Sequence, residues 1–186
     1  MQWAAEFKDI PETLAARPDL RAAMHLLLEA RPLPVKVTEG ADRDARRRAI
    51  LGKVIDGALS LDEAIAETER RLVRDGSPHA ANNRVFATGW ARRLIYTHIS
   101  VLYTWAVLEA LLAAGQPRCF VAHSSAEAAT STCSQLVAGK LHDAAAMRDR
   151  LVAAYVTGRP PRAPFVPSHP HCTHVASPPP ERAEPR

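Results

Sequence analysis

One long apolar stretch constrains the fold more than any other part of the chain. It runs from about Asn83 to Ala114 and stops at Gly115, a residue type that often follows the last helical turn. Apolar side chains recur along it at helical spacing, at Phe86, Trp90, Leu94, Ile95, Leu102, Trp105, Leu108 and Leu112. A continuous helix over this range would be about 45–50 Å long. We therefore expect a central helix on which the other elements pack.

Shorter helices are predicted on the N-terminal side of this stretch. Prolines divide the first 35 residues into two or three helical pieces, at Pro11, Pro18, Pro32 and Pro34. A buried apolar stripe predicts a helix over residues 42–58, at Ile50, Leu51, Val54 and Ile55. Ser60 and Glu63 have the spacing of a capping box, which predicts the start of a helix over 61–74.

The C-terminal side predicts two short strands and one more helix. Residues 118–123 are β-branched and aromatic, and 172–177 can pair with them antiparallel. A helix is expected between Asp143 and Gly158. The fold class is therefore mainly α, with a long central helix, a helical N-terminal region and a small two-stranded C-terminal β element. We divide the chain into a helical segment (1–41), a domain (42–176) and a disordered proline-rich tail (177–186).

Composition indicates an ordinary soluble domain. Of the 186 residues, 47% are hydrophobic and 24% are charged. The odd number of cysteines, three, argues against a disulfide framework and for a cytosolic origin. The N-terminus lacks the pattern of a signal peptide, and the apolar run around Glu109 is too short and polar for a membrane span, so we expect neither.

Charge is unevenly distributed along the chain. Residues 1–80 carry 13 Lys and Arg against 14 Asp and Glu, whereas residues 81–186 carry 11 against 6. A positive C-terminal half fits contact with DNA, although ordinary solubilising charge is the simpler interpretation. The basic residues that we predict to contact nucleic acid are Arg92, Arg93, Arg118, Lys140, Arg148 and Arg150.

Cysteine and histidine residues form the strongest chemical signal. His169, Cys172 and His174 lie within six residues, and Cys133 follows a strand predicted to lie beside them. These four side chains form a Cys2His2 set suited to tetrahedral zinc, with substitutes at His123, His142 and His171. A hydrogen-bonded loop and a redox or nucleophilic cysteine remain as alternatives. Phosphate-binding loops, dinucleotide turns, G-x-S-x-G and H-E-x-x-H are absent.

Four blocks in order resemble the MuF-like phage head morphogenesis family, whose members are also called minor head or minor capsid proteins. The blocks are "GALSLDEAI" (57–65), the long helix (93–115), "CFVAHSSAEAATSTCSQLVAGK" (119–140) and "VPSHPHCTHVASP" (166–178). The resemblance covers about residues 49–178, and the last two blocks are its most specific part. Tyr96 and His98 replace the arginine and glutamate of the family's long-helix motif.

The resemblance also implies a ligand set. The family's four metal-type positions fall on Thr130, Cys133, Cys172 and His174. Thr130 replaces a cysteine, and His169 matches a histidine of the family and can fill the gap, which implies a structural zinc ion.

The resemblance implies a role in virion assembly. Such a protein would associate with the portal or the major capsid protein, contact packaged DNA, and act as an oligomer in the capsid interior after synthesis in the host cytoplasm. The family brings no established catalytic mechanism. The alternative is a small zinc-dependent hydrolase or nuclease-type toxin, which would use His123, Glu127, Cys133, His169, Cys172 and His174. A third interpretation is a helical DNA-binding adaptor, whose binding would weaken steeply with salt.

Overall fold

The computed structural model describes residues 3–31, 33, 35–159 and 161–180. Its α-helices are α1 (Ile10–Ala16), α2 (Pro18–Ala30), α3 (Arg43–Ile55), α4 (Leu61–Arg71), α5 (Trp90–Ala113), α6 (Thr132–Val137) and α7 (Ala144–Tyr155). Its strands are β1 (Arg118–Val121), β2 (Lys140–Asp143) and β3 (Ala176–Ser177). Short 3-10 helices cover Phe7–Asp9, Lys36–Thr38 and Arg74–Gly76. The mainly helical α+β class is confirmed.

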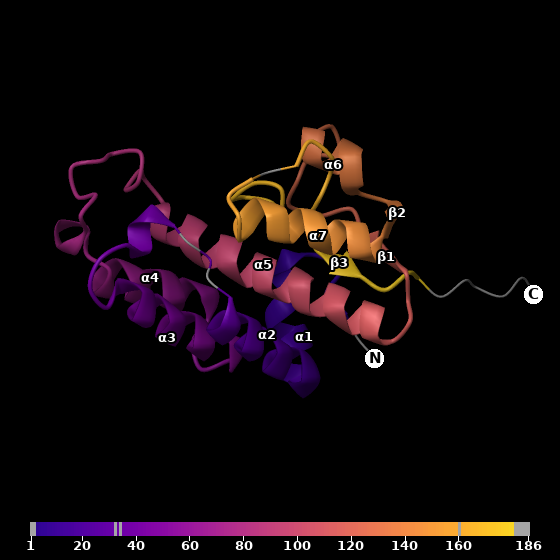
Figure 1. The fold of residues 1–186 in the computed structure, drawn as a ribbon, viewed down its shortest axis with the longest axis horizontal. Helices are drawn as coiled ribbons and strands as arrows, with labels where there is room; N and C mark the ends of the chain where they lie inside the picture. Colours follow the sequence, from indigo (N-terminus) through magenta and orange to yellow (C-terminus); the bar gives the residue numbers. More distant parts are fainter. Residues whose placement is uncertain (1–2, 32, 34, 160, 181–186) are drawn as a thin grey trace, which may run out of the picture.

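Helix α5 is the centre of the fold, as predicted. It packs against α2, α3 and α4 on one side and against α7, β1 and β3 on the other. Figure 1 shows this as a layer of N-terminal helices below α5 and a C-terminal layer above it. The central helix therefore separates the N-terminal helices from the C-terminal layer.

The central helix is shorter than the sequence indicates. It begins at Trp90 because Gly89 adopts φ +73°, and residues 83–89 form turns instead of helix. Its 24 residues span about 36 Å. The expected end is confirmed, since Gly115 has φ +70° and its amide donates to Leu112 O at 3.0 Å.

The sheet contains one strand more than predicted. Strands β1 and β3 pair antiparallel, with Val121 opposite Ala176, as expected. The missed strand β2 pairs with the other edge of β1, so the strand order is β2-β1-β3. Its sequence, KLHD, lacks the alternation of apolar and polar residues that marks a half-buried strand.

Local capping signals place several helices correctly. Ser60 and Glu63 form the predicted capping box of α4, with Glu63 N donating to Ser60 Oγ at 3.2 Å and Ser60 N to Glu63 Oε2 at 2.8 Å. Asp143 caps α7 by accepting from Ala146 N at 2.7 Å. Helix α6 was not predicted.

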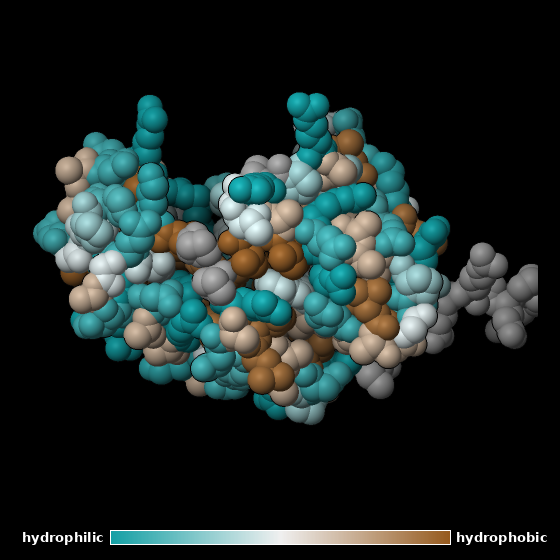
Figure 2. All heavy atoms as spheres, in the orientation of Figure 1, coloured by the Kyte–Doolittle hydropathy of each residue, from teal (hydrophilic) through white to brown (hydrophobic). Residues whose placement is uncertain are grey.

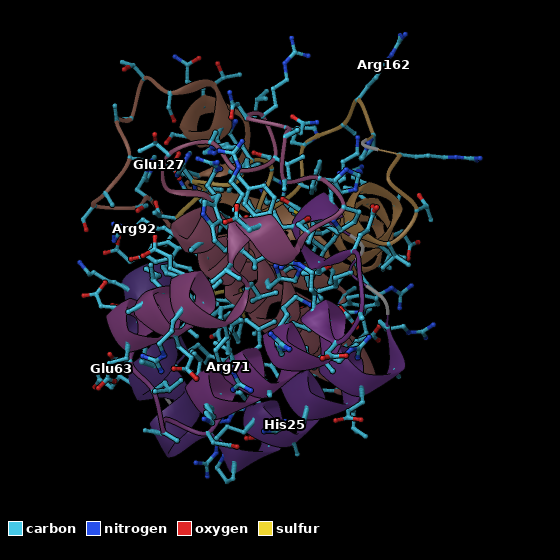
Figure 3. All side chains as sticks on the ribbon, turned by 90° about the vertical axis from the view of Figure 1, so that its left-hand side faces the viewer. His25, Glu63, Arg71, Arg92, Glu127 and Arg162 are labelled. Atoms are coloured by element: carbon cyan, nitrogen blue, oxygen red, sulfur yellow. The ribbon has the colours of Figure 1, made fainter. Side chains whose placement is uncertain are left out.

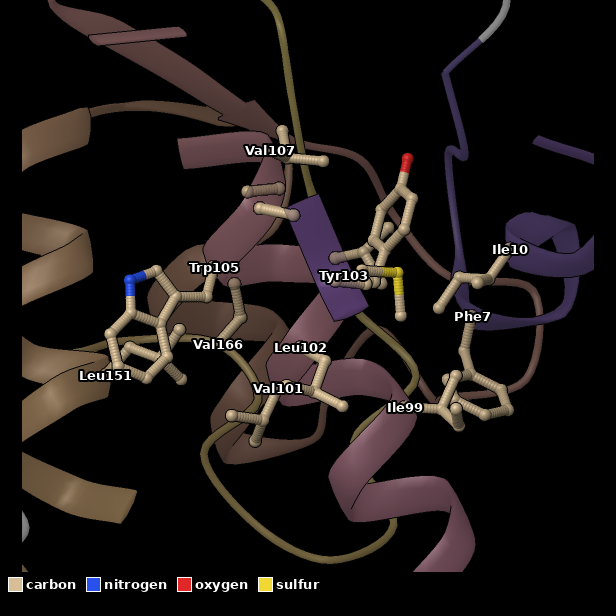
Figure 4. Packing of buried hydrophobic residues seen from close by; sticks show 14 of the residues in the cluster. Phe7, Ile10, Ile99, Val101, Leu102, Tyr103, Trp105, Val107, Leu151 and Val166 are labelled. Carbon is tan, nitrogen blue, oxygen red and sulfur yellow. The ribbon is translucent and has the colours of Figure 1, made fainter. Parts of the chain in front are cut away.

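One hydrophobic core joins residues from the whole described chain. It contains Phe7 and Ile10 from the N-terminal segment and Leu151 and Val166 from the C-terminal part. Figure 4 shows these two groups on opposite sides of α5. Residues on both sides of the boundary expected at 41/42 therefore contribute to the same cluster.

The tail begins later than predicted. Ser177 belongs to β3 and lies opposite Phe120, and residues 178–180 line a surface hollow together with Trp3. The expectation of disorder is therefore wrong at Ser177, because strand pairing holds this residue. Residues 181–186 lie outside the described part of the chain.

The surface is mainly hydrophilic on the face shown in Figure 2, with apolar side chains exposed mostly near the centre. Helix α5 is long and apolar enough to cross a membrane, but 78% of its most apolar stretch is buried inside the protein. A core helix of a packed domain has the same properties.

Candidate metal centre

Three side chains that are distant in sequence meet in the C-terminal layer. Cys133 comes from α6, and Cys172 and His174 come from the extended segment that leads into β3. Cys133 Sγ lies 3.5 Å from Cys172 Sγ and 3.6 Å from His174 Nδ1, and Cys172 Sγ lies 3.7 Å from the same nitrogen. All three residues are buried. The structure thus brings together the two sequence blocks that carry the predicted ligands.

These three distances match one face of a zinc tetrahedron. With Zn–S bonds of about 2.3 Å and Zn–N bonds of about 2.0–2.1 Å, tetrahedral geometry puts two sulfurs about 3.8 Å apart and a sulfur and nitrogen about 3.6 Å apart. The His174 ring leaves Nδ1 facing both sulfurs, while its Nε2 lies 3.3 Å from Ser134 Oγ. A hydrogen bond at the distal nitrogen is the usual outer contact of a metal-bound histidine.

Glu127 and His169 lie beside this face. Glu127 Oε1 is 3.3 Å from His174 Nδ1, and Glu127 Oε2 is 3.7 Å from His169 Nε2. Ligand atoms of Glu127, Cys133 and His169 lie within 4.8 Å of one another. The Glu127 side chain is 11% exposed and that of His169 is 40% exposed. The two ligand groups share Cys133, so the buried carboxylate and the more accessible imidazole are the two candidates for a fourth ligand.

Local structure explains how short segments hold these ligands. Ser131 caps α6 by accepting from Ser134 N at 3.1 Å, which fixes the helical turn that carries Cys133. Cys172 N donates to His169 O at 3.0 Å and closes a turn between two candidate ligands. Pairing of β3 with β1 then directs the preceding residues toward α6.

The electrostatics of the site favour one thiolate. Hydrogen bonding from the Cys172 thiol lowers the pKa of Cys133 to about 4, with further help from His174 and Ser168 and against the effect of burial. The hydrogen bond to Cys133 raises the pKa of Cys172, and burial and the charge on Cys133 raise it further. Burial opposes protonation of His174, but Cys133 and Glu127 raise its pKa above the ordinary value. A divalent cation would replace these protons and stabilise both thiolates.

Glu127 remains ionised for a different reason. Burial acts to raise its pKa, but hydrogen bonds from Thr173 outweigh burial and lower it. Thr173 N donates to Glu127 Oε1 at 2.6 Å, and Thr173 Oγ1 donates to the same oxygen at 3.0 Å. Figure 3 shows Glu127 in the upper layer, far from His25 and Glu63 in the N-terminal helices.

Three of the four predicted ligands form one group, the fourth, His169, falls in a second group that shares only Cys133 with the first, and the suggested substitutes belong to neither group in the described part of the chain. Cys133, Cys172 and His174, with Glu127 and His169 beside them, lie close enough to bind a metal. Thr130, the fourth position that the resemblance implies, is exposed and belongs to neither ligand group that the described ranges contain. His123, His142 and His171 belong to neither of the ligand groups found among the described residues. His142 Nε2 instead contacts Val137 O at 2.9 Å.

The sequence predicts Glu127 only as a base for a hydrolase, whereas the structure places it in a candidate ligand group with Cys133 and His169. No spacing rule links it to Cys133, and the contacts that hold its carboxylate come from Thr173, far along the chain. The only sequence signal was its position in the loop between β1 and α6.

The six basic residues predicted to bind nucleic acid do not converge. Arg92 and Arg93 lie at the start of α5, whereas Arg118 lies beyond its other end, about 36 Å away along the helix. Arg93 donates to Ala87 O and Thr88 O, Arg150 to Pro164 O, and Lys140 to Gln135 O. Arg148 pairs with Asp149 and Glu109. These contacts give several members of the set structural roles.

Comparisons with family models, with curated proteins and with solved structures found no match to this chain.

Proposed function

We propose that this chain binds one structural zinc ion through Cys133, Cys172 and His174, with Glu127 or His169 as the fourth ligand. The observation that carries the proposal is the set of three mutual distances of 3.5–3.7 Å among two sulfurs and one imidazole nitrogen. A hydrogen-bonded loop has no need for this triangle, because Nδ1 can carry only one hydrogen. Zinc bonds all three atoms at once.

Burial supports a structural role for the ion. Cys133 is 7% exposed, Cys172 is 5% exposed and His174 is 0% exposed. A closed shell of four protein ligands is typical of structural zinc, whereas catalytic zinc keeps one open position. The ion would fasten the segment before β3 to α6, a helix of six residues.

We further propose that the protein acts in phage or prophage head morphogenesis, as a minor head protein associated with the portal or major capsid protein. Support comes from the MuF-like resemblance and from the contact between its two most specific blocks, at Cys133 and at Cys172 and His174. DNA contact is the weaker part of this proposal, because the basic residues are dispersed.

Elemental analysis of purified protein tests the metal proposal. We expect one zinc per chain in the wild type and loss of zinc in Cys133→Ser and Cys172→Ser. Cys119→Ser is the matched control, since Cys119 is a buried cysteine outside the ligand groups. If the purified wild type is folded but contains no zinc, the metal proposal is wrong and Cys133, Cys172 and His174 form only a hydrogen-bonded loop.

Co-expression tests the assembly proposal. The chain should copurify with portal or capsid proteins encoded beside its own gene, and its removal should reduce the yield of infectious heads. Neighbouring genes without portal, capsid or scaffold functions would contradict this role.

A zinc-dependent hydrolase or nuclease-type toxin is the second candidate. One observation favours it: Glu127 lies beside the half-exposed His169, an arrangement suited to a base at an open coordination position. Zinc-loaded protein that hydrolyses nucleic acid or peptide substrates, and loses this activity in Glu127→Gln while keeping its zinc, would support the enzyme. Absence of hydrolysis by the loaded protein would favour the structural role.

A further inference from the structure

The N-terminal segment reaches the zinc site, although the family resemblance does not cover it. We infer that residues 4–8, the N-terminal latch, position the metal ligands through the carboxylate of Glu6, so that zinc binding and docking of the latch stabilise each other. This inference builds on the zinc site proposed above. It assigns a function to a part of the chain for which the sequence offered none.

Glu6 makes an unusually complete set of contacts for an acidic residue. Its side chain is 11% exposed, and it accepts hydrogen bonds from Ser124 Oγ at 2.9 Å and from Ser125 N at 2.8 Å. Ser125 Oγ lies 2.9 Å from both carboxylate oxygens, and Lys8 Nζ lies 2.7 Å from Oε1. The carboxylate therefore fixes the start of the loop that carries Glu127, two residues after Ser125.

A second set of contacts links the latch to the segment that carries Cys172 and His174. Phe7 N donates to Thr173 O at 2.8 Å, and Glu6 forms an isolated antiparallel bridge with His174. Ser124 Oγ lies 2.7 Å from Thr173 Oγ1. The same Thr173 donates twice to Glu127 Oε1. A continuous network therefore runs from Glu6 through Ser124 and Thr173 to Glu127, and a backbone bridge joins Glu6 to His174.

The latch is itself attached to the central helix. Ala4 N donates to Tyr103 Oη at 3.0 Å, and Tyr103 is fully buried. The rings of Phe7 and Tyr96 stack with their centroids 4.4 Å apart. Glu6 is therefore held from both sides, by α5 and by the metal loops, which is the arrangement expected of an outer residue that orients metal ligands.

Zinc affinity measured by competition with a chromophoric chelator tests the latch. The variants are Glu6→Gln and Ser125→Ala, and Glu12→Gln is the control because Glu12 is an exposed glutamate on α1. Changes to outer contacts of metal ligands typically weaken binding 10- to 100-fold. We expect a loss of about 10-fold or more in Glu6→Gln and no change in the control. Circular dichroism would verify that each variant is folded.

Cobalt substitution separates positioning from general stability. The visible spectrum of bound Co²⁺ reports ligand geometry, so it should change in Glu6→Gln but not in Glu12→Gln. In the wild type, amide exchange in residues 4–8 should slow when zinc is added. Because both readouts compare folded proteins, a purely structural role for Glu6 would leave the cobalt spectrum unchanged.

The outcomes distinguish this inference from the zinc site itself. If the wild type binds one zinc and Glu6→Gln and Ser125→Ala bind it equally tightly, the latch is refuted while the site stands. If Glu6→Gln fails to fold, the zinc affinity of Ser125→Ala and the amide exchange of residues 4–8 in the wild type test the latch instead. Unchanged affinity in Ser125→Ala together with zinc-independent exchange would refute it. If the wild type binds no zinc, the proposed site and the latch both fall.

Discussion

Removing zinc should destabilise the protein by an amount that follows from the chain length it closes. Cys133 and Cys172 are separated by 39 residues. A cross-link that closes a loop of this length restricts the unfolded chain and stabilises the fold by about 4 kcal/mol in the chain-entropy description. By mass action, a stabilisation of about 4 kcal/mol corresponds to free zinc at about 1,000 times its Kd.

This stabilisation converts to a measurable shift in melting temperature. For a domain of about 150–250 residues, each kcal/mol corresponds to about 2–4 °C, so chelation should lower Tm by about 8–16 °C. The assay is thermal unfolding followed by circular dichroism, with and without a strong chelator. Cys172→Ala should melt near the chelated wild type and should no longer respond to the chelator.

The matched control is Cys119→Ala, which removes a thiol of equal size from a buried position in β1. This variant should lose stability from its own cavity but keep the full response to chelator. The reasoning is refuted if the wild type melts at the same temperature with and without chelator, or if Cys172→Ala responds as strongly as the wild type does.

Three further outcomes test the site and the latch. Metal content and cobalt spectra of Glu127→Gln and His169→Ala should identify the fourth ligand. The variant whose Co²⁺ complex loses its tetrahedral absorption is the one that lacks this ligand. If both spectra are unchanged, neither side chain is the fourth ligand and a water molecule occupies that position. Peroxide treatment of zinc-free protein should form a disulfide between Cys133 and Cys172, in which each thiol loses one hydrogen atom and peroxide is reduced to water. Bound zinc should suppress this reaction, and peptide mass mapping detects the disulfide. Equal cross-linking with and without zinc would contradict a zinc site shared by the two cysteines. Burial acts to raise the pKa of Glu6, but contacts with Lys8, Ser125 and Ser124 outweigh burial and lower this pKa from 4.5 to about 2. The ionised carboxylate therefore stabilises the fold above pH 4.5, and this stabilisation is lost as the pH falls toward 2. Denaturant unfolding at several pH values should therefore show wild type and Glu6→Gln differing most at neutral pH and converging near pH 2, and a constant difference would argue against an ionised Glu6.

The sequence was sufficient for elements with local signals. The apolar spacing identified α5, and the Ser60–Glu63 spacing identified the start of α4, because each pattern is complete within one or two helical turns. The start of α5 was misplaced because Gly89 interrupts a stretch whose apolar residues, such as Phe86, continue in the loop and pack on Trp90 from there. Strand β2 has no local signal, since only its pairing with β1 makes it a strand.

The candidate site was predictable in its cysteines and histidines but not in its carboxylates. Cys133, Cys172 and His174 are of residue types that commonly bind metals, so their chemistry is visible in sequence. Glu127 and Glu6 are ordinary acidic residues, and what distinguishes them is a buried set of donors from Thr173, Ser124 and Ser125. The tertiary fold brings these donors to the carboxylates from distant parts of the chain, so no residue spacing in the sequence indicates them.

The distribution of core residues explains why a metal is useful at this position. The N-terminal layer consists of helices of up to 13 residues whose apolar faces meet α5. The C-terminal layer has one helix of similar length, the 12-residue α7, but the elements around the candidate ligands are a six-residue helix, α6, and a two-residue strand, β3. Both elements are short, although Val137 of α6 and Ala176 of β3 are buried in the hydrophobic core. Short units commonly gain stability from a metal or a cross-link. A zinc ion between α6 and the segment before β3 would add a long-range connection to this packing, and Glu6 would extend that connection to α5.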